Sequence, residues 1–260
     1  MLGKLLKYEY RATARVCLPF LGATLFMACV SRLLRILSGI DSAAFVIGTV
    51  LSSFMIAAVC VVALVMAIQQ FRRNLLGDEG YLMLTLPVST DALIFSKLIV
   101  AVTWFAVSAV VAVFAILLLA VTDVNEMLRD FARMFAIPSW KEAWLAASLT
   151  VEAILAAIGG AASVTLTFYV CLAVPMRANR YRGLLGFGIW IGISTVLQIL
   201  GVILGTIISE SNWFYEWFTK LYAPTAMQLP LCAAIIVELA ISAAMYAITR
   251  TSLRNNLNLE

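Results

Sequence analysis

Six long apolar segments constrain this chain more than any other feature of its sequence. Each approaches or exceeds the roughly 20 residues that an α-helix needs to cross a bilayer. Only 12% of the residues are charged, about half the fraction typical of soluble domains. The sequence therefore predicts an all-α polytopic membrane protein, a single domain over residues 1–260. The expected spans are Val16–Leu34, Ala43–Ala67, Leu98–Val121, Trp144–Val174, Leu184–Ile208 and Pro230–Ile248.

Absent residue types exclude several kinds of chemistry. The chain has no histidine, which excludes His-ligated haem, HExxH metalloprotease sites and Ser–His catalytic pairs. It has no phosphate-binding loop of the Walker type, so it cannot hydrolyse ATP by that route. We expect no catalytic residue, no metal site and no cofactor bound by this chain. The cysteines lie inside apolar segments and are interpreted as packing residues: Cys17, Cys29, Cys60, Cys171 and Cys232.

The distribution of basic residues predicts the orientation of the spans. With both termini in the cytosol, two thirds of the 18 Lys and Arg residues fall on the cytosolic side, as the positive-inside rule requires. We therefore expect a multi-pass protein of the bacterial plasma membrane. The net charge of +4 concerns orientation and lipid headgroups rather than nucleic acid. The twelve cytosolic cations are Lys4, Lys7, Arg11, Arg15, Arg72, Arg73, Lys97, Arg177, Arg180, Arg182, Arg250 and Arg254.

Residues 1–15 have the pattern of an amphipathic helix lying on the membrane surface. Lys4, Lys7, Arg11 and Arg15 recur at helical spacing, and leucines supply another face. Two interpretations are open: a basic flank that only orients the first span, or a surface helix that also contacts a cytosolic partner.

Residues 71–97 form the longest charged excursion between two spans. Asp78 and Glu79 suit a helix N-terminus, and Pro87 ends the short helix that would follow. Ser89 or Thr90 can cap the helix that becomes span three. The short helix has no core of its own, so we expect it either to dock into a groove on another protein or to pack against lipid.

This loop resembles the coupling region of ABC exporter permeases of the ABC-2 (type V) class. The similar motif reads Gly-Asp-Glu-Gly-Tyr-Leu, then Thr-Leu-Pro-Val-Ser and Ser-Lys. The opening Leu-x-Lys-Leu-Leu-Lys-Tyr-Glu-Tyr, six spans and cytosolic termini also resemble this class. The matching loop positions are Gly77, Asp78, Glu79, Gly80, Tyr81, Leu82, Leu86 and Pro87.

The resemblance implies a partner that supplies energy. The cytosolic coupling helix would insert into a cleft of a separate ATPase subunit, which would bind ATP and Mg²⁺. These permeases work in pairs, so a second permease chain is expected, either identical or related. The resemblance also implies short re-entrant helices outside, between spans five and six. There residues 212–224 are unusually aromatic, and they fit either a gate or a lipid anchor.

Span five carries two Gly-x-x-x-Gly pairs, Gly188/Gly192 and Gly201/Gly205. Small residues at that spacing let helix backbones approach closely. They predict packing within one chain or a dimer seam, and the resemblance favours the seam.

Glu152 and Glu238 are acidic residues well inside apolar segments. Each lies about nine residues from the outer start of its predicted span, which places both near the membrane midplane. Ionisable groups there normally face a cavity or a partner. A role in a substrate path and a buried structural role are both open.

The sequence thus predicts a permease subunit of an ATP-driven exporter, which forms the substrate path and is not itself an enzyme. The alternative is an ion- or proton-coupled secondary carrier that uses Glu152 and Glu238. A membrane scaffold without transport activity is a third interpretation.

Overall fold

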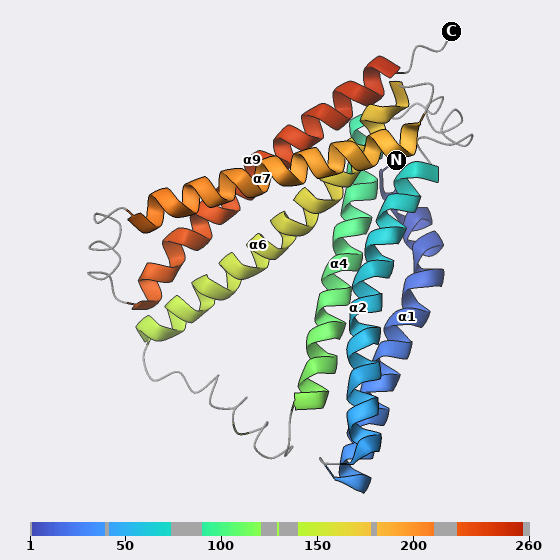
Figure 1. Cartoon of the computed structure of the whole chain (residues 1–260), viewed down its shortest axis with the longest axis vertical. Coiled ribbons are helices and arrows are strands. Elements are labelled where there is room, and N and C mark those ends of the chain that lie inside the picture. The colour runs from blue at the N-terminus through green and yellow to red at the C-terminus, as the bar shows by residue number, and fades with distance from the viewer. Residues whose placement is uncertain are drawn as a thin grey trace. The chain divides into compact units, whose positions relative to one another are not determined.

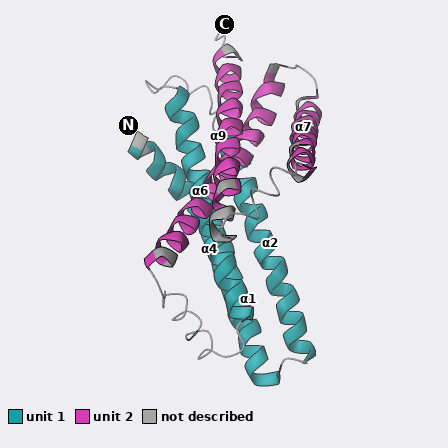
Figure 2. Ribbon diagram, turned by 90° about the vertical axis from the view of Figure 1, so that its left-hand side faces the viewer, with its two compact units in different colours: residues 1–138 teal, residues 139–260 magenta. Residues whose placement is uncertain are grey.

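The computed structural model describes residues 2–39, 42–73, 90–120, 129, 140–177, 181–210 and 223–256. Over these residues the chain is almost entirely helical, and six helices are long and apolar enough to cross a membrane. They divide between two compact units, residues 1–138 and 139–260 (Figures 1 and 2). The all-α class and the six apolar helices are therefore confirmed.

Unit 1 is built from three helices that run side by side (Figure 1). Its first helix is antiparallel to the second, because Ser31 meets Ser52 while Glu9 meets Gln70. The third helix is parallel to the first and contacts both others. These helices are α1 (Leu2–Ser38), α2 (Ala43–Phe71) and α4 (Thr90–Ala120).

Helix α1 joins two elements that the sequence analysis separated. The basic arm of residues 1–15 and the first span form one helix of 37 residues. Pro19 lies inside it and cannot donate a hydrogen bond to the preceding turn, which favours a bend. Figure 2 shows the first turns of α1 set at an angle to the remainder. The predicted arm is thus a bent extension of the first span.

A short connection reverses the chain between α1 and α2. Gly39 has φ 82°, a left-handed conformation that glycine adopts without steric cost at a helix C-terminus. Its backbone N–H donates to the carbonyl of Arg35. Ser42 then caps α2, accepting a hydrogen bond from the backbone N–H of Phe45 at 3.2 Å.

A seam of small and hydroxyl side chains joins α1 to α2. The hydroxyls of Ser31 and Ser52 are 2.8 Å apart, so one donates to the other, and each also lies 2.9 Å from a carbonyl oxygen of its own helix. Gly48 is buried beside Ser31, where a Cβ would lie 2.9 Å from the Ser31 hydroxyl oxygen. Close approach of backbones at small residues is how helices associate in lipid, where apolar side chains gain little from leaving the solvent.

Helix α4 is described from Thr90, with Asp91 in its first turn. Ser89 lies outside the described residues, so the predicted cap at Ser89 or Thr90 stays a prediction. Span three was expected from Leu98, so the helix extends about two turns further toward the loop. Residues 90–97 therefore belong to α4, and Lys97 lies inside a helix rather than in a loop.

Unit 2 is organised around two parallel helices. The Gln228 amide donates to the Ser148 hydroxyl at 2.6 Å, and further along the pair Glu238 lies against Gly159. Its helices are α6 (Trp140–Ala173), α7 (Arg182–Glu210) and α9 (Ala223–Asn256), with a 3₁₀ turn, η2 (Val174–Arg177), after α6. Helix α6 has 34 residues, more than a perpendicular crossing of a bilayer requires.

We predict that Gly48→Ala destabilises unit 1 by about 1–3 kcal/mol, because the new methyl group overpacks the seam. Ser31→Ala in the same chain should recover part of this loss, since it removes the nearest atom. Gly22→Ala is the matched control, because a Cβ there meets no atom within 4 Å. Thermal unfolding of the purified protein in detergent measures all three. Equal melting temperatures for Gly48→Ala and Gly22→Ala would contradict the assigned packing.

Candidate functional site

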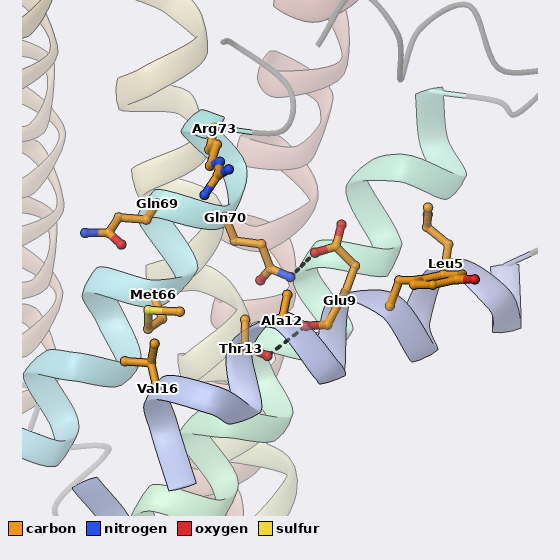
Figure 3. Close-up of a pocket in the computed structure, with 10 residues that line it drawn as sticks. Leu5, Glu9, Ala12, Thr13, Val16, Met66, Gln69, Gln70 and Arg73 are labelled. Atoms are coloured by element: carbon orange, nitrogen blue, oxygen red, sulfur yellow. Dashed lines mark hydrogen bonds between the residues drawn. The ribbon is translucent and has the colours of Figure 1, made fainter. Parts of the chain in front are cut away.

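The most concentrated polar site among the described residues lies in unit 1, where α2 ends and α4 begins. Three side chains form it, and we call it the Glu9 cluster: Glu9 on α1, Gln70 on α2 and Lys97 on α4. The Lys97 ammonium donates to Glu9 Oε1 at 2.7 Å, and the Gln70 amide donates to Glu9 Oε2. Figure 3 shows the Glu9 carboxylate turned toward Gln70. One carboxylate thus binds donors from two other helices.

The charged groups of this cluster are removed from solvent. The side chain of Lys97 is 1% exposed and that of Glu9 is 5% exposed. Buried charges are expensive unless they are paired and hydrogen-bonded, and here both conditions are met. Removing either the Glu9 carboxylate or the Lys97 ammonium would leave the other charge buried and uncompensated. The stability of this cluster therefore depends on both side chains.

Further hydrogen bonds fix the register of α1 against α4. The Trp104 indole donates to the Thr13 hydroxyl at 2.7 Å, and Thr13 donates to the carbonyl of Glu9. The hydroxyls of Tyr10 and Thr103 lie 2.6 Å apart. Together with the Glu9–Lys97 pair, these two contacts hold the first turns of α1 in one position along α4.

The Glu9 cluster is close to both ends of the predicted coupling segment. Gln70 lies about one helical turn before residue 74, and Lys97 about two turns after residue 89. The predicted coupling residues fall between them, outside the described part of the chain: Gly77, Asp78, Glu79, Gly80, Tyr81, Leu82, Leu86 and Pro87. Their assignment stays a prediction.

A pocket of about 570 Å³ lies beside the cluster, between α1 and α2 (Figure 3). Leu5, Val16 and Met66 contribute apolar surface, whereas Glu9, Gln70 and Arg73 contribute polar groups.

The two intramembrane glutamates both lie in unit 2. The Glu238 carboxylate packs on α6, where Cβ atoms at Gly159 and Gly160 would lie 2.9 and 3.4 Å from its oxygens. Only glycines leave this space. The Oε2 atoms of Glu152 and Glu238 are buried and have no hydrogen-bond partner among the described residues. Their predicted part in a substrate path stays a prediction.

The two glutamates lie at different levels along the α6–α9 pair. In the α6–α9 register, Glu238 lies level with Gly159, which is seven residues beyond Glu152 on the same helix. At about 1.5 Å per residue the two levels differ by about 10 Å. The predicted position of both side chains near the membrane midplane stays a prediction.

The glycine pairs of α7 are not used for packing within unit 2. A Cβ at Gly188, Gly192, Gly201 or Gly205 would meet no atom within 4 Å. A different glycine makes the close contact: a Cβ at Gly186 would lie 2.6 Å from the Cys171 carbonyl oxygen. Packing elsewhere in the chain and a dimer seam are both still open for the four predicted glycines.

Other candidate regions lie wholly or largely outside the described residues. These include residues 211–222, where re-entrant helices were expected.

All five cysteines are free. Among the described residues no three Cys, Asp or Glu side chains gather as metal ligands would.

Sequence reasoning missed the Glu9 cluster, because its two charged residues each fit an ordinary surface pattern. Glu9 is the sole acidic residue in the basic arm of residues 1–15. Lys97 is followed directly by apolar residues and was counted as the last residue of a loop. Both therefore looked like residues of a solvated surface, and their pairing across 88 positions has no local signature.

Comparison with protein-family models, with curated proteins and with solved structures found no match.

We predict that Glu9→Gln lowers the stability of the protein by about 3–5 kcal/mol, because it leaves the Lys97 ammonium buried without its carboxylate. The exchange variant Glu9→Lys/Lys97→Glu should recover part of the loss. Lys7→Gln, an exposed change of one charge on the same helix, is the control. Thermal unfolding in detergent is the measurement. If Glu9→Gln and Lys7→Gln have the same melting temperature, the Glu9–Lys97 ion pair contributes nothing to stability.

Proposed function

We propose that this chain is the transmembrane permease subunit of an ATP-binding-cassette exporter, of the ABC-2 (type V) class. Its termini face the cytosol of a bacterium, and its spans form the substrate path. A separate ATPase subunit binds ATP and Mg²⁺ and docks on the segment of residues 74–89. The chain itself catalyses no reaction.

The observation that carries this proposal is the Glu9 cluster. A coupling segment transmits force only if the helices at its two ends move together with the rest of the unit. Here α2 and α4 are both bound to one carboxylate on α1. A displacement of residues 74–89 would therefore move three spans together. Without the cluster, the ends of α2 and α4 could bend independently and the other helices would not move.

In this mechanism, ATP binding brings two ATPase subunits together and displaces the coupling segments. The displacement turns each α1–α2–α4 unit as one body, because the polar seam and the Glu9 cluster resist sliding between its helices. The spans then close toward the cytosol and open outward. Substrate crosses the membrane or leaves the inner leaflet during this change.

The mechanism requires a second permease chain, since six spans alone hardly enclose a path. Helix α7 is the best candidate for the interface between the two permease chains. None of the described side chains in its apolar stretch is buried, and a Cβ at any of its four paired glycines would meet no atom of the described chain within 4 Å. A partner helix placed there would bring its backbone close to that of α7.

One observation favours a second candidate, the ion- or proton-coupled carrier. Two buried carboxylate oxygens, on Glu152 and Glu238, have no hydrogen-bond partner within the described ranges; such groups are unusual in apolar spans and suit a transported cation. Transport that persists without ATP and collapses with the ion gradient would establish this function in place of the first.

The proposal predicts a stoichiometric ATPase among the chains that purify with this protein from native membranes in detergent. Glu79→Gln/Tyr81→Ala should abolish that association, or leave ATP hydrolysis uncoupled from transport, while the protein remains inserted. The matched control is Tyr215→Ala/Glu216→Gln, the same two changes in the segment expected outside the membrane.

A preparation that contains no nucleotide-binding partner would overturn the permease proposal and favour the carrier. Equal ATPase association and transport in the two double variants would leave the partner in place but remove the coupling role of residues 79 and 81.

A further inference from the structure

We infer that the contact between α6 and α9 contains a binding site for one alkali cation, Na⁺ or K⁺. Its ligands would be the Oε2 atom of Glu238 and the hydroxyl oxygen of Ser242, both on α9. Gly159 and Gly160 of α6 leave the space in which the carboxylate lies. The inference goes beyond the proposed function, because it requires neither an ATPase nor transport of the ion.

The first observation is a pair of unsatisfied oxygen atoms one helical turn apart. Glu238 and Ser242 are separated by four residues on α9, so their side chains lie on the same side of the helix. Glu238 Oε2 and the Ser242 hydroxyl oxygen are both buried, and neither has a hydrogen-bond partner among the described residues. Such atoms are rare in proteins, and an ion bound at the site explains them. Glu152 is a weaker candidate, because no second unsatisfied oxygen lies within a turn of it in α6.

The second observation favours a metal cation over a proton. A proton on the carboxyl group would still leave Glu238 Oε2 and the Ser242 hydroxyl unsatisfied, because neither makes a hydrogen bond to the other or to another described group. A hard cation bridges a wider gap, since each oxygen binds it at about 2.3–2.6 Å in the case of Ca²⁺. One ion between the two oxygens would therefore satisfy both.

The third observation concerns charge, and it indicates a monovalent ion. On α9 the basic residue nearest to Glu238 is Arg250, twelve residues further along and about 18 Å away. On α6 the carboxylate nearest in level is Glu152, about 10 Å away. Ca²⁺ sites use more oxygen ligands and often several carboxylates. A single positive charge would neutralise Glu238, whereas a divalent ion would leave an unbalanced charge in an apolar span.

The two glycines of α6 hold the carboxylate in one place. A Cβ at Gly159 would lie 2.9 Å from Glu238 Oε2, and a Cβ at Gly160 would lie 3.4 Å from Oε1. The carboxylate therefore rests against the backbone of α6, and a larger residue would displace it. A ligand group that is already fixed loses little conformational freedom when the ion binds.

Polar groups lead to the site along the same helix contact. Ser148 and Gln228 are hydrogen-bonded at 2.6 Å near the start of the pair, and Glu152 follows Ser148 by one turn. Gly159 follows Glu152 by seven residues, so these three residues of α6 lie on one face. An ion would thus meet oxygen atoms at several levels on its way to Glu238.

Cation binding to the purified protein tests the inference. The protein in detergent is equilibrated in choline chloride, and NaCl or RbCl then replaces choline at constant ionic strength. Radioactive Na⁺, or Rb⁺ as an analogue of K⁺, is used to count the bound ions. We expect one saturable site per chain for at least one of these ions, and MgCl₂ should not compete for it.

Two substitutions test the ligands. Glu238→Gln should abolish saturable binding, and Ser242→Ala should weaken it by roughly tenfold or more. Glu210→Gln is the control for charge, because Glu210 is an exposed carboxylate of the same unit. Thr251→Val is the control for a hydroxyl group, because the Thr251 hydroxyl is exposed and donates to the Ala247 carbonyl on the same helix. Both controls should bind the ion as the unchanged protein does.

A glycine substitution tests the position of the carboxylate. Gly159→Ala should weaken binding, because the new methyl group displaces Glu238 Oε2. Gly22→Ala should leave binding unchanged, since a Cβ there meets no atom within 4 Å. Melting temperatures in choline chloride show whether each variant is folded before the ion is added.

Three results would overturn the inference. No saturable binding of Na⁺ or Rb⁺ by the folded protein would leave Glu238 with a proton or a structural role. Unchanged binding in Glu238→Gln would place the ion elsewhere. An equal loss of affinity in Glu152→Gln and Glu238→Gln would contradict a site built from Glu238 and Ser242. None of these results involves ATPase association, so the permease proposal succeeds or fails separately.

Discussion

The arrangement of unit 1 depends on one buried ion pair. In a bilayer, apolar side chains gain little by leaving lipid for a neighbouring helix, so apolar contact alone does not determine which helices associate or at what height. A carboxylate in such surroundings must find donors. Glu9 has them from α2 and α4 simultaneously, which allows few alternative placements of either helix. The hydrogen bonds of Thr13 and Tyr10 then follow on the same face of α1.

The helices within each unit are held together by different kinds of contact. In unit 1, polar contacts continue along the helices, from the Glu9 cluster through the Ser31–Ser52 pair to the bond from Arg35 to the Leu119 carbonyl. In unit 2, α6 and α9 approach through glycines, and two carboxylate oxygens are left without partners among the described residues. Unit 1 is thus suited to move as one body. The described part of unit 2 contains buried polar atoms whose hydrogen bonds are not satisfied within it.

Local signals in the sequence accounted for the helices, and long-range pairing accounted for what was missed. Six apolar segments of sufficient length predicted the six helices, although α1 and α4 begin well before their apolar segments do. Glu9 and Lys97 each carry an ordinary surface pattern, so nothing in either segment announces the other. Spacing likewise drew attention to Gly188 and Gly192, whereas the contact falls on Gly186, because the curvature and crossing point of helices decide which glycine faces a neighbour.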